Sequence, residues 1–103
     1  MTFDKKVDKT IKEISNLLKS KNKAYGNSAL NPSNIFSKQS AADSLCARID
    51  DKLMRIKNKG IYDATEDTVK DLIGYLVLLL IALEEQKNNY ISEGSQTSKN
   101  LPN

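Results

Sequence analysis

The sequence predicts an all-α fold: a small bundle of three main helices, with a loop or short helix between the first two. Apolar residues recur at spacings of three and four in three segments, which is typical of amphipathic helices. No segment alternates like a strand over a useful length, and turn-forming residues separate the three segments. We therefore expect one helical domain over residues 1–90. Residues 91–103 are expected to form a flexible tail, because they are polar and include too few apolar residues to fold alone.

The first helix is predicted over residues 3–22. Its apolar positions share one face at helical spacing: Phe3, Val7, Ile11, Ile14, Leu17 and Leu18. Lysines and acids fill the other positions, and this lysine-rich face suits either solvent or an anionic partner. Residues 23–34 then break the pattern with glycine, asparagine and proline. Tyr25 and Phe36 flank this loop, where an aromatic ring could stack on a base or anchor the loop to the core.

The second helix is predicted from Ser40 to Asn58. Ser40, followed three residues later by Asp43, suits an N-terminal cap. Gly60, just after the last predicted residues, suits the helix end. A narrow apolar stripe runs along this helix through Ala42, Leu45, Ile49, Leu53 and Ile56.

The third helix is predicted to start near Thr65 and to run to about Asn88. Asp63 and Glu66 fit a capping box at its start. Residues 72–83 are almost all apolar, a run too short to span a bilayer and suited to a buried core helix. A chain of 103 residues has few other elements to cover such a helix. We therefore expect a homo-oligomer that assembles through the third helix.

The composition excludes several kinds of site. The chain has 16 basic and 13 acidic side chains, a net charge of +3, and no histidine, which excludes a histidine-ligated metal, a histidine general base and a Ser-His-Asp triad. The single Cys46 excludes an intrachain disulfide and fits a reducing compartment. The sequence has no visible signal peptide or membrane span, so we expect a cytoplasmic protein without a membrane partner. DNA is not an expected partner, because the charge is mild and no recognition helix is evident.

Two groups of charged residues form the candidate site. The first group, three cations and one carboxylate, shares one edge of the second helix: Arg48, Asp51, Lys52 and Arg55. An acidic group opens the third helix: Glu66, Asp67 and Asp71. Asp67 and Asp71 are four residues apart and could share a Mg²⁺ ion with substrate phosphates, for which the arginine forks are suited. The alternative interpretation is that the two groups form ordinary interhelical salt bridges.

Three segments occur in an order that resembles a known family: KNKAYG (21–26), RIDDKLMRI (48–56) and EDTVKDLIGYLVLLL (66–80). Over residues 15–85 the chain resembles the phage and bacterial family called nucleotide modification associated domain 1, which is associated with phage nucleotide metabolism and base modification. Its helical pattern is similar to that of the all-α MazG-type pyrophosphatases, which bind Mg²⁺ and a nucleoside triphosphate within helical oligomers.

The resemblance implies a role for particular residues of this chain. It implies that Tyr25 and Gly26 cover the base or sugar. It implies nucleotide or phosphate binding by a further set: Arg48, Asp51, Lys52 and Arg55. It implies that Asp67 and Asp71 hold a metal, with Mg²⁺ as the expected ion, or receive hydrogen bonds. Glu66, beside them in the sequence, is a further candidate ligand.

The acidic motif departs from the MazG pattern. Asp50 and Asp51 could imitate its two adjacent acids, but the third acidic position falls on Leu53 or Met54. Ala24 stands where an acid is expected before the Tyr-Gly pair. Fewer carboxylates weaken Mg²⁺ coordination, so the sequence favours binding over hydrolysis, and no catalytic residue is assigned.

The leading hypothesis is a small phage-type nucleotide-binding protein in the host cytoplasm. It would hold a phosphate-bearing nucleotide or nucleotide-derived signal between helices, either in nucleotide metabolism or in anti-defence sequestration. The first alternative is a Mg²⁺-dependent nucleoside triphosphate pyrophosphatase of the MazG type. The second is a module that docks on a host protein through its apolar third helix.

Overall fold

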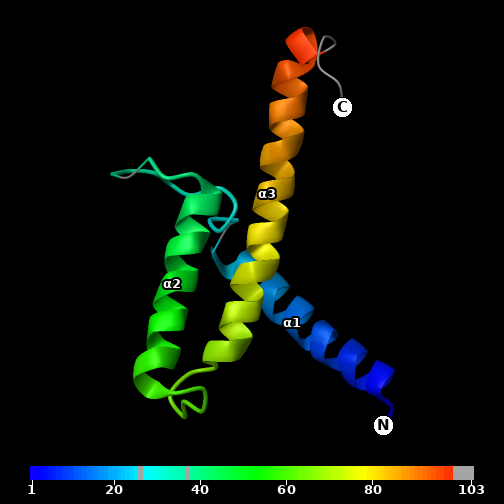
Figure 1. Ribbon diagram of the computed structural model, residues 1–103, viewed down its shortest axis with the longest axis vertical. Coiled ribbons are helices and arrows are strands. Elements are labelled where there is room, and N and C mark those ends of the chain that lie inside the picture. The colour runs from blue at the N-terminus through cyan, green and yellow to red at the C-terminus, as the bar shows by residue number, and fades with distance from the viewer. Residues whose placement is uncertain (26, 37, 99–103) are drawn as a thin grey trace.

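The computed structural model describes residues 1–25, 27–36 and 38–98 and confirms the all-α prediction (Figure 1). Three helices, α1 (Phe3–Tyr25), α2 (Ala41–Lys59) and α3 (Thr68–Ser98), account for the secondary structure, and no strand occurs in these described ranges. α2 and α3 form an antiparallel hairpin, and α1 crosses beside α3 (Figure 1). The bounds of α1 and α2 lie close to the predicted ones.

Both predicted ends of α2 are confirmed. The hydroxyl of Ser40 accepts a hydrogen bond from the backbone N–H of Asp43 at 3.1 Å, which satisfies one of the free donors of the first turn. At the other end Gly60 adopts a φ of 84°, a conformation that favours glycine, and its N–H donates to the carbonyl of Ile56 at 2.8 Å. Local sequence signals therefore define this helix.

The start of α3 differs from the prediction. The helix begins at Thr68, and the predicted capping box does not form. Asp63 instead accepts the backbone N–H of Thr65 at 2.8 Å within the connecting loop, and Glu66 accepts the ammonium of Lys52 at 2.8 Å. Both carboxylates also bond to cations of α2, Asp63 to Arg55 and Glu66 to Lys52, and these partners come within reach only when the hairpin closes.

The end of α3 also differs from the prediction. The helix continues past Asn88 to Ser98, so residues 91–98 are helical, while 99–103 lie outside the described residues. The flexibility of the tail stays a prediction. No helix within the described residues is long and apolar enough to cross a membrane.

The core of the single chain is small. Among the described residues the buried apolar side chains are Ile14, Leu45 and Ala82, with Thr68 as the buried polar one. Gly74 allows α1 to approach α3 closely, because a Cβ atom at this position would lie 3.1 Å from the Cδ2 atom of Leu18. This contact places α1 against the side of α3 that also faces α2.

Within the single chain α3 is not covered all round, in line with the expectation that a chain of this length has too few other elements to cover it. Leu76, Leu80 and Leu83 are exposed, Leu80 by 70%. The reason is that α1 and α2 pack on one side of α3 and leave the other side open. The radius of gyration is 17.1 Å, against about 13 Å for a compact domain of this length. The chain is therefore extended, with extents of 52 × 41 × 27 Å.

Candidate functional site

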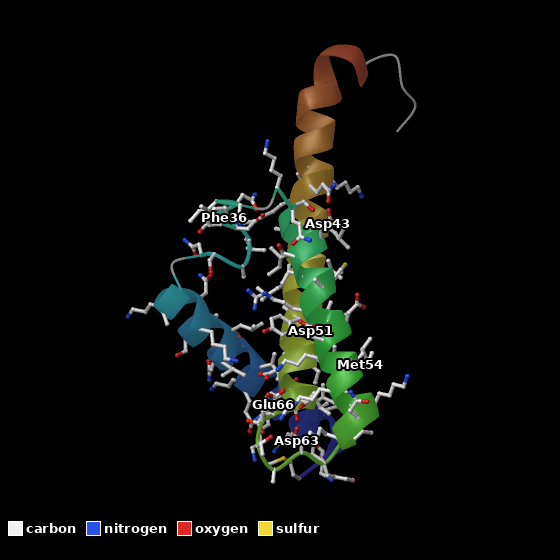
Figure 2. The ribbon with its side chains drawn as sticks, turned by 90° about the vertical axis from the view of Figure 1, so that its left-hand side faces the viewer. Phe36, Asp43, Asp51, Met54, Asp63 and Glu66 are labelled. Atoms are coloured by element: carbon white, nitrogen blue, oxygen red, sulfur yellow. The ribbon has the colours of Figure 1, made fainter. Side chains whose placement is uncertain are left out.

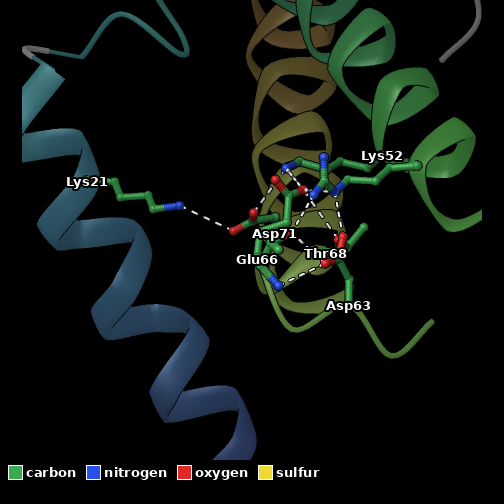
Figure 3. A network of polar contacts seen from close by, with 8 residues as sticks. Lys21, Lys52, Asp63, Glu66, Thr68 and Asp71 are labelled. Atoms are coloured by element: carbon green, nitrogen blue, oxygen red, sulfur yellow. Dashed lines mark hydrogen bonds and ion pairs between the residues drawn. The ribbon is translucent and has the colours of Figure 1, made fainter. Parts of the chain in front are cut away.

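A network of ion pairs ties the lower end of α2 to the loop before α3 and to its first turn (Figure 3). The Lys52 ammonium donates to Glu66 at 2.8 Å and to Asp71 at 3.1 Å. The Arg55 guanidinium donates to Asp63 at 2.7 Å and lies 3.1 Å from Glu66. Lys52 therefore bridges the loop and the helix, and Arg55 holds the loop.

α1 and two threonines complete this network. The Lys21 ammonium lies 3.3 Å from the second oxygen of Asp71, which links α1 to the α2–α3 hairpin. The Thr65 hydroxyl accepts from Arg55 at 2.6 Å, and the buried Thr68 hydroxyl donates to Glu66 at 3.3 Å. No buried side-chain nitrogen or oxygen of the described residues lacks a hydrogen-bond partner.

These contacts shift the pKa values of the network. Hydrogen bonds from the Thr65 hydroxyl and backbone N–H, with the charge of Arg55, lower the pKa of Asp63 to about 2. The hydrogen bond to Glu66, together with Asp71, raises the pKa of Lys52 despite its burial. The same bond from Lys52 lowers the pKa of Glu66. All three groups are therefore charged near neutral pH.

Asp71 is balanced between two opposing effects. Burial alone would raise the pKa of this carboxyl, but hydrogen bonds from Lys52 and Lys21 outweigh it and lower the pKa. Asp71 is therefore ionised and held by two ammonium groups from two different helices.

The network confirms the salt-bridge interpretation for Lys52 and Arg55. Lys52 pairs with Asp71 and Glu66 of the acidic group, and Arg55 pairs with Glu66 and with Asp63, which lies outside both groups. Asp51 and Asp67 are exposed and make no ion pair with any described residue. In Figure 2 Asp63 and Glu66 lie together at the loop, while Asp51 lies higher on α2.

The predicted metal site stays a prediction. Within the described ranges no group of three or more metal-ligating side chains comes together. Of the predicted ligands, Glu66 and Asp71 accept from Lys52, and Asp67 is exposed. A Mg²⁺ ion at these carboxylates would have to displace the Lys52 ammonium.

A pocket of about 370 Å³ lies beside the network, between the three helices and the turn after α1. Its apolar lining comes from Leu17, Leu18, Ala29, Leu45, Gly74 and Leu78. Its polar lining comes from Lys21, Asn22, Ser28, Arg48, Lys70, Asp71 and Tyr75. A mostly apolar cleft with a few convergent polar groups is the usual form of a small-molecule site, and this volume is at the small end of that class.

Arg48, one of the predicted phosphate-binding residues, lines this pocket. Its guanidinium carbon lies 6.0 Å from the centroid of the Tyr75 ring, at the outer limit of a cation–π contact. Arg48 forms no ion pair within the described part of the chain, and neither does Lys70. Their charges are therefore available to an anion in the pocket.

The structure thus divides the predicted site. It brings together Lys52, Arg55, Glu66 and Asp71 in the network and assigns Arg48 to the pocket, with Asp71 shared by both. Tyr25 is the last residue of α1, and Gly26 lies outside the described residues. Phe36 does not anchor its loop to the core, because its side chain is fully exposed at the far end from Asp63 (Figure 2).

Sequence reasoning missed several pocket residues: Lys21, Asn22, Ser28, Lys70 and Tyr75. The sequence did indicate Tyr75, because this residue lies four positions after Asp71 and therefore shares its face of the helix. Gly74, an interruption in the apolar run, also indicated a close approach at this position. The contribution of α1 carried no sequence signal, since it depends on where that helix crosses α3.

Comparison with protein-family models, with curated proteins and with solved structures finds no match for this chain.

Proposed function

We propose that this protein binds a phosphate-bearing nucleotide or a nucleotide-derived signal in the pocket between its three helices. The observation that carries the proposal is the charge of the pocket lining. Lys21, Arg48 and Lys70 supply three positive charges against the one carboxylate of Asp71, a surplus of two. A surplus of two matches a phosphate group that is near its doubly charged state at neutral pH.

The two sides of the pocket suit the two parts of such a ligand. Arg48 offers a planar fork of donors that fits phosphate oxygens, and Lys70 adds a point charge. The leucines and the ring of Tyr75 offer an apolar surface for a base or sugar. A planar base on the Tyr75 ring would also shield the Arg48–phosphate pair from water and so strengthen it.

The proposed phosphate-binding residues differ from those of the sequence-based hypothesis. Lys52 and Arg55 neutralise carboxylates next to the pocket, and Arg48, Lys21 and Lys70 face the phosphate. Two biological uses fit such a ligand, the first from the family resemblance and the second by analogy with phage sponge proteins. One is phage nucleotide metabolism, and the other is sequestration of a host immune nucleotide signal in an anti-defence role.

The test is a binding screen with chemical identification of the ligand. Purified protein is incubated with nucleoside triphosphates and with cyclic and dinucleotide signals in the presence of Mg²⁺, and the bound and free pools are read by mass spectrometry. Intact nucleotide recovered from the denatured protein is the expected result. A monophosphate with released pyrophosphate would instead indicate the MazG-type reaction. Absence of any bound or altered nucleotide would contradict the proposal.

A pair of matched variants locates the site. We expect Arg48→Ala to weaken binding at least tenfold, because a hydrogen-bonded charge pair contributes about 1.5–3 kcal/mol. Lys57→Ala removes an exposed cation of the same helix outside the pocket and should leave the affinity unchanged. Equal losses in both variants would indicate general attraction to positive charge, without a site at Arg48.

We also propose that the chain works as a homo-oligomer that assembles through α3. The support is the exposed apolar side of this helix, since a solvent-facing row of leucines is costly in a monomer. Light scattering at micromolar concentration is expected to give a multiple of the chain mass of 11.5 kDa. A mass of one chain at these concentrations would contradict the assembly.

A further inference from the structure

The open side of α3 carries a regular apolar stripe. It comprises Val69, Ile73, Leu76, Leu80 and Leu83, whose spacings of four, three, four and three residues are those of a coiled-coil seam. Four of these five side chains are exposed large hydrophobics, Leu80 by 70%. A seam of this kind packs against another helix at a shallow angle.

The outer half of α1 carries a second apolar stripe. Ile14 is buried and Leu18 contacts the Gly74 position, but Phe3, Val7 and Ile11 continue the same face into solvent. Figure 1 shows this half of α1 pointing away from the α2–α3 hairpin. Phe3 is 77% exposed and Ile11 59%. The apolar face of α1 is thus covered near Ile14 and Leu18 and exposed to solvent from Phe3 to Ile11.

The two stripes cannot cover each other within one chain. Leu18 of α1 meets α3 at Gly74, which at 100° per residue lies about 140° around the helix from Val69. α1 is therefore held near the face of α3 opposite the stripe. Its outer half leads away from the α2–α3 hairpin (Figure 1).

The chain exposes more surface than a compact protein of its mass. The chain exposes 8443 Å², whereas a compact protein of 11.5 kDa exposes about 5,800 Å². The excess of about 2,600 Å² includes the end of α3 that projects beyond the other helices, yet a standard interface needs only about 800 Å² from each partner.

We propose that the occupant of both stripes is a second copy of this chain, with the outer half of α1 from each copy packed on the α3 stripe of the other. A two-fold axis relates two such contacts, so a single closed interface covers both stripes. One kind of partner thus accounts for two exposed surfaces that point in different directions. The inference extends the proposed assembly through α3 by naming α1 as the other element, and it does not depend on nucleotide binding.

Disulfide trapping tests which helices meet. In a Cys46→Ser background, a tagged chain with Ile11→Cys is mixed with an untagged chain with Leu80→Cys under mild oxidation. We expect a mixed cross-linked dimer to be the main product. The control replaces Ile11→Cys by Met54→Cys, an exposed position on α2 outside both stripes, and should cross-link much less. Preferential cross-linking of Leu80→Cys chains to each other would overturn the exchange of α1.

Charge substitution provides an independent readout. Val7→Glu with Ile11→Glu should reduce the mass in light scattering to 11.5 kDa while the helical circular dichroism is kept. Met54→Glu, the matched control, should leave the assembled mass unchanged. A double variant that remains assembled would overturn the role of α1. Because all pocket residues come from one chain, nucleotide affinity should survive in the monomer, so this result is separate from the binding test.

Discussion

The two halves of the α2–α3 hairpin are closed by different forces. At the lower end, Lys52 and Arg55 neutralise carboxylates of the connecting loop and of α3. At the upper end, Leu45 is 1% exposed and lines the same pocket as Tyr75 and Leu78 of α3. The lower half is therefore stabilised by ion pairs. The upper half is stabilised by apolar burial, and the charge of Arg48 takes no part in it.

The position of the loop carboxylates explains why similar cations of α2 have different roles. Arg48, Lys52 and Arg55 share one edge of α2, so the sequence treats them alike. The connecting loop brings Asp63 and Glu66 only to the lower two, and Arg48 lies beyond their reach. A cation left without a carboxylate beside an apolar pocket is the arrangement that suits an anionic ligand.

The largest expected effect comes from breaking the apolar half. Leu45→Ala removes the most buried large side chain of α2 and leaves a cavity, so we expect the free energy of unfolding to fall by about 2–5 kcal/mol. Urea unfolding followed by circular dichroism measures this loss. Leu53→Ala on the same helix, at an exposed position, should cost less than about 1 kcal/mol. Similar losses in both variants would mean that Leu45 does not anchor the hairpin.

A smaller effect is expected from breaking the polar half. Lys52→Met leaves Asp71 with one partner fewer in a partly buried position, and we expect a loss of about 1–3 kcal/mol in the free energy of unfolding. Arg48→Met, the matched change in the upper half, should alter stability by less than about 0.5 kcal/mol and instead weaken ligand binding. If Arg48→Met proved the more destabilising of the two, the division of roles between the halves would be wrong.

Stability is expected to depend on pH through the charged groups of the lower half. The pKa values of Asp63, Glu66 and Asp71 are lowered by folding, so their contributions exist above the ordinary values of 3.8 and 4.5 and disappear as the pH falls through the folded values. The pKa of Lys52 is raised, so its contribution exists below 10.5 and disappears as the pH rises through the folded value. We expect stability to be level between about pH 5 and pH 10 and to decline on both sides.

Urea unfolding midpoints across this range measure the dependence. Asp63→Asn should flatten the acid limb, since the pKa of Asp63 falls to about 2 in the folded chain. Asp50→Asn, an exposed change on α2 outside the network, serves as the control. An acid limb that is the same in Asp63→Asn as in the wild type would show that the loop carboxylate adds no pH-dependent stability.

The smallest effect is expected where α1 meets the upper half. Gly74→Ala gains about 1 kcal/mol of helix propensity but places a Cβ atom 3.1 Å from Leu18, whose methyl must shift. We expect these effects to cancel to within about 1 kcal/mol in urea unfolding. A loss well above this value would mean that Leu18 cannot yield and that α1 is held rigidly on α3.

Several features of this protein follow from the sequence alone, because their causes are local. The apolar spacing predicts three helices, and Ser40 and Gly60 predict the ends of α2. The i, i+3, i+4 and i+7 spacing predicts that Arg48, Asp51, Lys52 and Arg55 share an edge, since helix geometry alone determines that relation. The open apolar side of α3 also follows from its composition, because this helix has more leucines than the other helices of the chain can cover.

Other features are decided only by the tertiary structure. Asp63 and Glu66 resemble a capping box in sequence, yet once the hairpin closes Glu66 pairs with Lys52, and Asp63 pairs with Arg55 while it accepts the N–H of Thr65 in the loop. The pocket exists because Gly74 lets α1 cross α3 close to Arg48, a meeting of residues far apart in the chain. Spacing specifies which side chains share a face, but the partner of each face depends on how the helices pack, and that packing separates Arg48 from Lys52.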